Sequence, residues 1–220
     1  MTGCHILWKG GDGVPLDTFF RLPEEKRARL LDAAWEEFST VGYSDVSINK
    51  IILRARIPRG SFYQYFADKE DLFGYLVEEV KRRLVKISEW VMEQEGQDIF
   101  SAALLVFDEL MEKESLAHPD LMRCIEVVKI NPGLGPSLFC GKGEGLFWNA
   151  FLEQNDLSVF RSQEREFLEQ TFMMLTTSLG YALVESLTRP EEKEAQRRML
   201  RIRLDIIRSG SLRQGAAGPV

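Results

Sequence analysis

A guanidinium, a glycine, a phenol and an amide occur within six residues of the chain, from Arg59 to Gln64. Phe62 and Phe66 lie four residues apart, so in a helix both point to one side and the polar residues to the other. In the major groove of DNA, an arginine can donate two hydrogen bonds to guanine and a glutamine can pair with adenine. The segment therefore predicts a surface that reads base edges, with Gly60 allowing close approach of the backbone.

Hydroxyl groups and an amine surround this surface and are suited to phosphate oxygens. Ser61, Tyr63 and Tyr65 offer hydroxyls, and Lys69 follows in the first turn of the next helix. Contacts to phosphate position a protein on DNA without specifying the sequence. We therefore expect these four residues to be phosphate contacts.

The elements that must position these groups are helices. Apolar residues three or four apart predict a first helix over residues 23–40, with Leu31, Ala34, Trp35 and Phe38 on its inner face. A second short helix should start at Ser47, which can cap it, and Pro58 prevents its continuation. A third helix carries the two phenylalanines. Two short helices joined by a tight turn form the geometry that places a recognition helix in the major groove.

The rest of the chain also has helical periodicity, so we predict an all-α protein. Asp68 and Asp71 can cap a long fourth helix that runs to about residue 95. Further helices are expected at 97–115, 119–130, 144–155, 163–187 and 190–208. The predicted organisation is a flexible arm (1–20), a three-helix head (21–70), a second helical domain (71–209) and a flexible tail (210–220).

Charge is distributed unevenly along the 220 residues, whose net charge is −6. The segment 17–70 has nine basic and nine acidic residues and is neutral, so the acidity lies in the rest of the chain. Counterion release depends on which cations meet phosphates rather than on total charge. A net acidic chain is therefore compatible with DNA binding by the head.

Other site chemistries find no support in the sequence. The three cysteines (Cys4, Cys124 and Cys140) are widely spaced, as suits a reduced, intracellular protein. His5 and His118 have no metal-ligand spacing with them, and no catalytic triad can be argued. No apolar run reaches about 18 residues. We therefore expect a cytoplasmic, nucleoid-associated protein without cofactor, metal, catalytic residues or membrane contact.

Residues 25–72 resemble the DNA-binding head of TetR-type transcriptional repressors. The resemblance rests on Ala34 and Phe38, on Gly42, on Ser47-x-x-x-Ile51, and above all on the run Gly60-Ser61-Phe62-Tyr63-x-Tyr65-Phe66-x-x-Lys69-Glu70-x-Leu72. It implies base contacts by Asn49 together with Arg59, Gly60 and Gln64. It implies phosphate contacts by Ser47 together with the four residues named above.

Three positions depart from the family pattern. The usual alanine after Ile51 is Ile52, and the usual glycine of the turn is Arg56. The serine that normally caps the recognition helix is Pro58, which cannot cap by a hydrogen bond. An arginine is less comfortable than glycine in a left-handed turn. These changes affect the expected tilt of the recognition helix.

For the second domain, the resemblance implies a ligand pocket and a dimer interface. Large apolar residues of this domain are ordinary core or pocket lining; the predicted lining is Phe107, Leu110, Phe147, Trp148, Phe151 and Met173. Small residues at a spacing of four and an apolar stripe mark the last two helices as bundle core or dimer seam. The predicted seam is Ser178, Ala182, Ser186, Met199, Ile202 and Ile206.

Two functions follow as alternatives. In the first, a homodimeric repressor binds a palindromic double-stranded operator and leaves it when an unknown small apolar molecule shifts the helix at 69–95. In the second, the chain is an all-helical small-molecule binding protein or enzyme that retains the head only as a structural unit.

Overall fold

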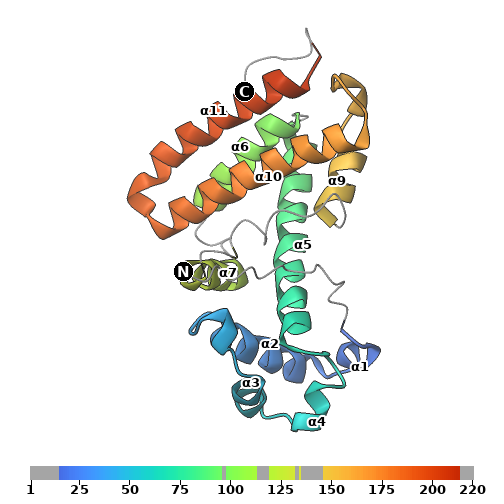
Figure 1. The fold of residues 1–220 in the computed structure, drawn as a ribbon, viewed down its shortest axis with the longest axis vertical. Coiled ribbons are helices and arrows are strands. Elements are labelled where there is room, and N and C mark those ends of the chain that lie inside the picture. Colours follow the sequence, from blue (N-terminus) through green and yellow to red (C-terminus); the bar gives the residue numbers. More distant parts are fainter. Residues whose placement is uncertain (1–14, 96–97, 113–118, 132–133, 135–145, 214–220) are drawn as a thin grey trace. The chain divides into compact units, whose positions relative to one another are not determined.

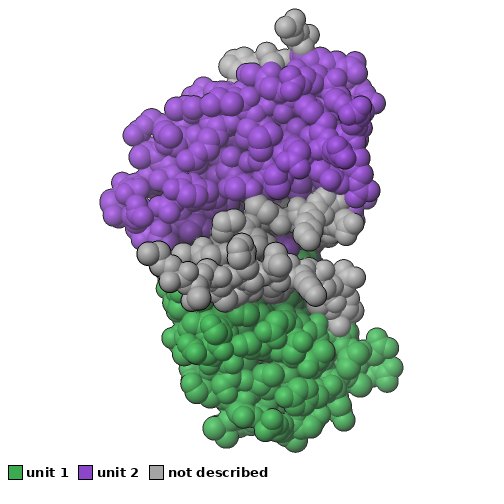
Figure 2. Space-filling model, viewed as in Figure 1, with its two compact units in different colours: residues 1–80, 118–134 green, residues 81–117, 135–220 purple. Residues whose placement is uncertain are grey.

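The computed structural model describes residues 15–95, 98–112, 119–131, 134 and 146–213. Across these residues the chain forms helices and turns, with one isolated bridge between Phe160 and Leu212, so the predicted all-α class is confirmed. Two compact units are formed, unit 1 by residues 1–80 with 118–134 and unit 2 by 81–117 with 135–220 (Figure 2). Helix α5 (Lys69–Glu95) contributes its first turns to unit 1 and its remainder to unit 2.

Unit 1 contains the predicted head. Its elements are α1 (Asp17–Phe20), α2 (Glu24–Phe38), η1 (Tyr43–Asp45), α3 (Ile48–Ala55), α4 (Arg59–Phe62), the start of α5, and α7 (Pro119–Ile130). Helix α2 packs against α3 and buries Ala34, Trp35 and Phe38, as its periodicity predicts, but it buries Leu30 more fully than the expected Leu31. The loop that joins α3 to α4 lies on the side of α3 and α4 that faces away from α2 (Figure 1).

Residues 15–20 were expected in a flexible arm, but they are part of the folded head. The Phe19 side chain is fully buried, with its ring centroid 5.0 Å from that of Phe66 and 5.2 Å from that of Tyr75. The Leu16 N–H donates to the Tyr65 carbonyl at 3.1 Å, and the Thr18 hydroxyl donates to the Gln64 carbonyl. A four-residue helix is too short for periodicity to reveal, so burial of one aromatic ring decides its place.

Helix α7 belongs to unit 1, although the sequence boundary at residue 70 assigned it to the second domain. Arg123 of α7 pairs with Asp32 of α2 at 2.8 Å. The Asn131 side-chain oxygen accepts from the Tyr43 N–H, also at 2.8 Å. A segment far along the chain therefore completes the head, and sequence order alone cannot show this.

Unit 2 is built from the later helices. Besides the remainder of α5 it contains α6 (Ile99–Glu112), α9 (Leu146–Gln154), η2 (Leu157–Val159), α10 (Arg165–Thr188), η3 (Pro190–Glu192) and α11 (Lys193–Ser211). Helices α10 and α11 run antiparallel side by side, and both pack on α6 (Figure 1). Arg197 of α11 donates two hydrogen bonds of 2.6 Å to Asp108 of α6. None of the described helices is long and apolar enough to cross a membrane.

Candidate nucleic-acid interface

Helix α4 and the turn after it have one buried and one exposed face, as predicted. Phe62 and Phe66 are fully buried. Arg59, Gly60 and Gln64 are exposed, and Tyr63 retains 45% of its accessible surface. The two phenylalanines therefore hold the segment against the head while the arginine, glycine and glutamine face outward together.

Gly60 has no packing reason to lack a side chain. A Cβ atom built there meets nothing within 4 Å, and the backbone is not in the left-handed region. The protein itself would accept alanine at this position. The open space above Gly60 is therefore available to a molecule that approaches the backbone closely.

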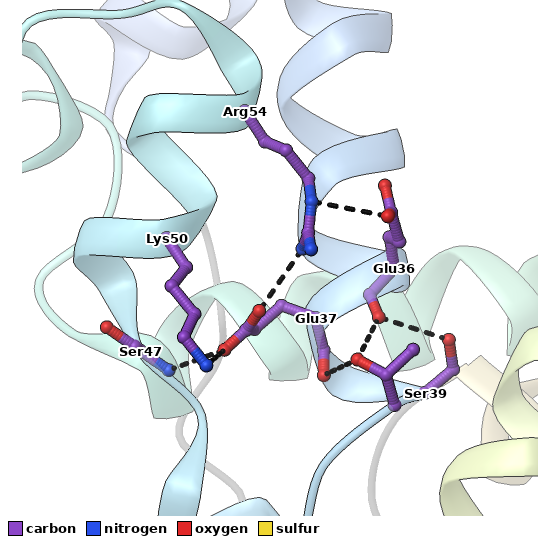
Figure 3. Close-up of polar contacts among 7 residues, drawn as sticks. Glu36, Glu37, Ser39, Ser47, Lys50 and Arg54 are labelled. Atoms are coloured by element: carbon purple, nitrogen blue, oxygen red, sulfur yellow. Dashed lines mark hydrogen bonds and ion pairs between the residues drawn. The ribbon is translucent and has the colours of Figure 1, made fainter.

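The buried carboxylate of Glu37 joins α2 to the start of α3 (Figure 3). Its side chain is 1% exposed, and Oε1 accepts from the Ser47 N–H at 3.3 Å. Lys50 Nζ lies 3.6 Å from the same oxygen, and Arg54 Nη1 lies 3.1 Å from Oε2. Arg54 Nε also pairs with Glu36 at 3.2 Å. Both cations on α3 are thus held by carboxylates of the preceding helix.

Sequence reasoning missed Glu37 and expected the Ser47 side chain to cap α3. The Ser47 side chain makes no capping hydrogen bond, and it is the backbone N–H of Ser47 that donates to the Glu37 carboxylate at the start of α3. The available signal was an acidic residue directly before Phe38, on the buried face of α2. Ser47 itself is half-buried and Asn49 is exposed, so both predicted contacts reach the surface of the head.

The turn between α3 and α4 places Arg56 in a left-handed conformation, with φ 54° and ψ 47°. The Ile57 N–H donates to the Ile52 carbonyl at 3.1 Å and the Arg56 N–H to the Leu53 carbonyl at 3.3 Å, which forms a Schellman motif. A residue with a Cβ in this conformation costs roughly 1–2 kcal/mol. Pro58 precedes α4 with an extended ψ of 143°, so it lies outside the helix rather than in its first turn.

Lys69 is engaged within the protein. Its Nζ donates to the carbonyls of Tyr43 and Ser44, at 2.9 and 3.1 Å, and lies 5.3 Å from the centroid of the Tyr43 ring. Burial, with a smaller effect from Glu70 and Asp68, raises the pKa of the Tyr43 phenol. The Lys69 amine, which was predicted to contact a phosphate, thus links α5 to the η1 turn by hydrogen bonds.

Two further predictions around the start of α5 have different outcomes. The cap by Asp68 is confirmed, since it accepts from the Asp71 N–H at 2.7 Å, but Asp71 accepts from the Ala67 N–H at 2.9 Å rather than from that of Asp68, so the capping box is incomplete. Tyr65 is buried, with its ring 6.3 Å from that of Phe19. Of the predicted phosphate contacts, Tyr63 is exposed, Ser61 is half-buried and Tyr65 mainly packs the core.

Unit 2 contains a partly open cavity of about 100 Å³. Its walls come from α5, α6, α9 and α10, and are lined by Leu84, Ser88, Ile99, Ala102, Ala103, Val106, Ala150, Phe151, Asn155, Phe172, Leu175, Thr176, Leu179, Gly180 and Leu183. No charged side chain is among these lining residues. Nor does any cluster of His, Cys, Asp and Glu in the described ranges suit a metal ion.

The polar groups of the cavity wall already donate to their own backbone. Ser88 Oγ donates to the Val85 carbonyl at 2.7 Å, and Thr176 Oγ1 to the Phe172 carbonyl at 2.9 Å. The amide nitrogen of Asn155 donates to the Phe151 carbonyl at 2.8 Å. These three side chains still have oxygen lone pairs to offer an occupant, and Asn155 also keeps its second amide N–H.

Of the predicted pocket residues, Phe151 lines this cavity. Phe107, Leu110 and Trp148 are buried elsewhere in unit 2, and Met173 is exposed on α10. The Phe147 side chain lies outside the described part of the chain. The large side chains of Phe107 and Trp148 fill space in the core of unit 2. The cavity lies where the small residues Ala102, Ala103, Ala150 and Gly180 leave space unfilled.

The predicted dimer seam is divided between surface and core. Met199, Ile202 and Ile206 are exposed on α11, the last by 67%, and Ser178 is half-exposed on α10. Ala182 and Ser186, by contrast, are 0% and 2% exposed within the single chain. Their small side chains let α10 approach its neighbours inside unit 2, so they are not available to a second copy.

The head contains the part of the chain that matches a known protein family in sequence. Residues 30–76 match the family model of bacterial regulatory proteins, tetR family. The uncharacterized HTH-type transcriptional regulator YdgC of Bacillus subtilis is 33% identical over 91 residues, which cover 40% of this chain and 47% of that protein. The transcriptional regulator AcuR of Cereibacter sphaeroides is 43% identical over 49 residues, 22% of each chain. The chain thus spans less than half the length of these curated relatives.

Among solved structures, SmeT, the repressor of the Stenotrophomonas maltophilia multidrug efflux pump SmeDEF, has a TM-score of 0.50 at 21% identity. That match covers 89% of this chain and 96% of SmeT. The SmeT–triclosan complex gives the same TM-score at 19% identity, covering 88% and 95%. These likenesses extend the shared fold beyond the head. The chain carries, in residues 30–76, the helix-turn-helix head of the TetR-type family of regulators.

Proposed function

We propose that this protein is a transcriptional repressor that binds operator DNA through α3, the turn and α4. The observation that carries the proposal is the exposed set of Arg59, Gly60 and Gln64 above two buried phenylalanines. A guanidinium and an amide side by side can each make a paired contact to a base edge. Such a protein acts on DNA in the cytoplasm of a bacterial cell.

The repressor acts as a homodimer joined through α10 and α11. Both helices expose large apolar side chains in the single chain: Met173, Met174, Tyr181, Met199, Ile202 and Ile206. An apolar surface of this kind favours a partner that covers it. Two copies related by a two-fold axis read a palindromic operator, which doubles the few base pairs that one short helix can reach.

A small, uncharged, apolar ligand that occupies the cavity of unit 2 releases the repressor from DNA. The lining is apolar apart from three uncharged side chains, each of which already donates a hydrogen bond to its own backbone. A charged ligand would enter this cavity without a counter-charge among the lining residues, which is costly. SmeT, a protein of the same fold, has been solved in complex with triclosan. Release requires that the ligand bind the DNA-free conformation more tightly.

Selection of bound duplexes from random sequence tests the DNA-binding part. We expect an inverted repeat to emerge, and electrophoretic mobility shifts on that sequence then test release by apolar compounds. Compounds that bind unit 2 without changing operator affinity would remove the ligand switch from the proposal. If no duplex is bound at low salt, the small-molecule binding alternative takes its place.

Replacing Gly60 by alanine should separate stability from DNA binding. Alanine is favoured over glycine in a helix by about 0.5–1 kcal/mol, and its Cβ meets no protein atom. Thermal unfolding should therefore show a small stabilisation, while operator affinity falls because the methyl group keeps the backbone from the duplex.

Gly210→Ala provides the matched control, since a Cβ at this exposed position in α11 also meets nothing within 4 Å. It should stabilise the protein to a similar extent and leave operator affinity unchanged. Equal operator affinity for Gly60→Ala and the wild type would show that the backbone at Gly60 does not approach DNA.

A further inference from the structure

The left-handed turn between α3 and α4 contains an arginine, Arg56, although the fold does not require an arginine there. Arg56 is the only non-glycine residue with positive φ among the described residues. Glycine would adopt this conformation without a Cβ clash and would keep both backbone hydrogen bonds of the motif. A favourable contact of the arginine side chain with a partner outside the head would offset this strain.

Contacts within the protein do not supply that gain. The Arg56 side chain is exposed and has no hydrogen bond or ion pair with any described residue. Lys50 and Arg54, on the adjoining helix, differ because Glu36 and Glu37 hold them (Figure 3). In the segment from α3 to α4, the guanidinium groups left for an external partner are thus those of Arg56 and Arg59.

The position of the turn suits a phosphate partner. The loop lies on the side of α3 and α4 away from α2 (Figure 1). Arg59 lies three positions after Arg56, so their Cα atoms are at most about 11 Å apart. The major groove is about 12 Å wide and is bordered by phosphates. With Arg59 inside the groove, an arginine this close along the chain reaches the strand at its edge.

We infer that Arg56 is a DNA phosphate contact of this head, held in a strained turn for that purpose. The inference rests on the proposed DNA-binding function. It also gives the neutral head a second cation beside the base-reading surface. Because a phosphate contact is independent of base sequence, it should strengthen binding to every duplex and steepen the dependence on salt.

Arg56→Gly tests this, with full-length protein and two probes, the selected operator and a random 30-base-pair duplex. The melting temperature should rise by about 2 °C, because roughly 1 kcal/mol corresponds to 2–4 °C for a chain of this size. Affinity for both duplexes should nevertheless fall about tenfold for each bound protomer, as for loss of a charged hydrogen bond. The slope of log affinity against log salt should become shallower by about one for each bound protomer.

Two variants sharpen the test. Arg56→Lys keeps the charge and should keep the salt slope, whereas Lys86→Gln removes an exposed charge from unit 2 and should change neither affinity nor slope. A wild-type slope for Arg56→Gly, or a fall in its melting temperature, would overturn the inference. Absence of binding by the wild type to both duplexes would instead reject the proposed function.

Discussion

Replacing Arg59 and Gln64 together by alanine is expected to abolish the preference of the protein for its operator over random DNA. Each good paired contact to a base is worth roughly 1–3 kcal/mol, so the double variant should lose about 2–6 kcal/mol of discrimination at each half-site. Competition binding between operator and random duplex measures this ratio directly. Affinity for random DNA should fall less, since Arg59 is the one charge lost at each half-site and Gln64 is uncharged.

The fold should not be affected by this change. Both side chains are exposed, and exposed substitutions usually alter stability by less than about 0.5 kcal/mol. An unchanged melting temperature therefore serves as the internal control, and the single variants divide the loss between the two residues. Retention of the full operator preference by the double variant would mean that another surface reads the bases.

Much of the head was predictable because its main determinants are local. The spacing of Phe62 and Phe66 fixes which side of α4 is buried, and Asp68 with Asp71 marks the start of α5. Glu37 shows where local reasoning fails. A serine before a helix suggests a side-chain cap, but Ser47 makes none, and a carboxylate ten residues earlier in the chain accepts from the Ser47 backbone N–H.

The second unit was harder to predict because its features depend on tertiary packing. A stripe of small residues has the same pattern whether it faces another copy or another helix of the same chain, and Ala182 and Ser186 do the latter. The cavity illustrates the same difficulty. Aromatic residues attract attention in a sequence, yet four of its lining positions are alanine or glycine, and empty space arises only once the neighbouring helices are placed.

The short helix α1 is another element whose place depends on tertiary packing. Its residues were expected to be mobile because the preceding segment is rich in glycine, but Phe19 fills the space beside the buried face of α4. Hydrogen bonds from Leu16 and Thr18 end on the carbonyls of Tyr65 and Gln64, directly after the recognition helix. A residue outside the helix-turn-helix therefore supports the segment proposed to read DNA.

Phe19→Ala should accordingly destabilise the head by about 3–5 kcal/mol, the usual cost of truncating a buried phenylalanine. Chemical denaturation of the full chain measures the loss, and Phe20→Ala is the matched control. Phe20 is 51% exposed, so its truncation removes less buried surface and should cost well under half as much. At temperatures where the Phe19 variant is still folded, its operator affinity should also fall, because the end of α4 loses its support. Equal stability of the two variants would show that α1 is not part of the core of the head.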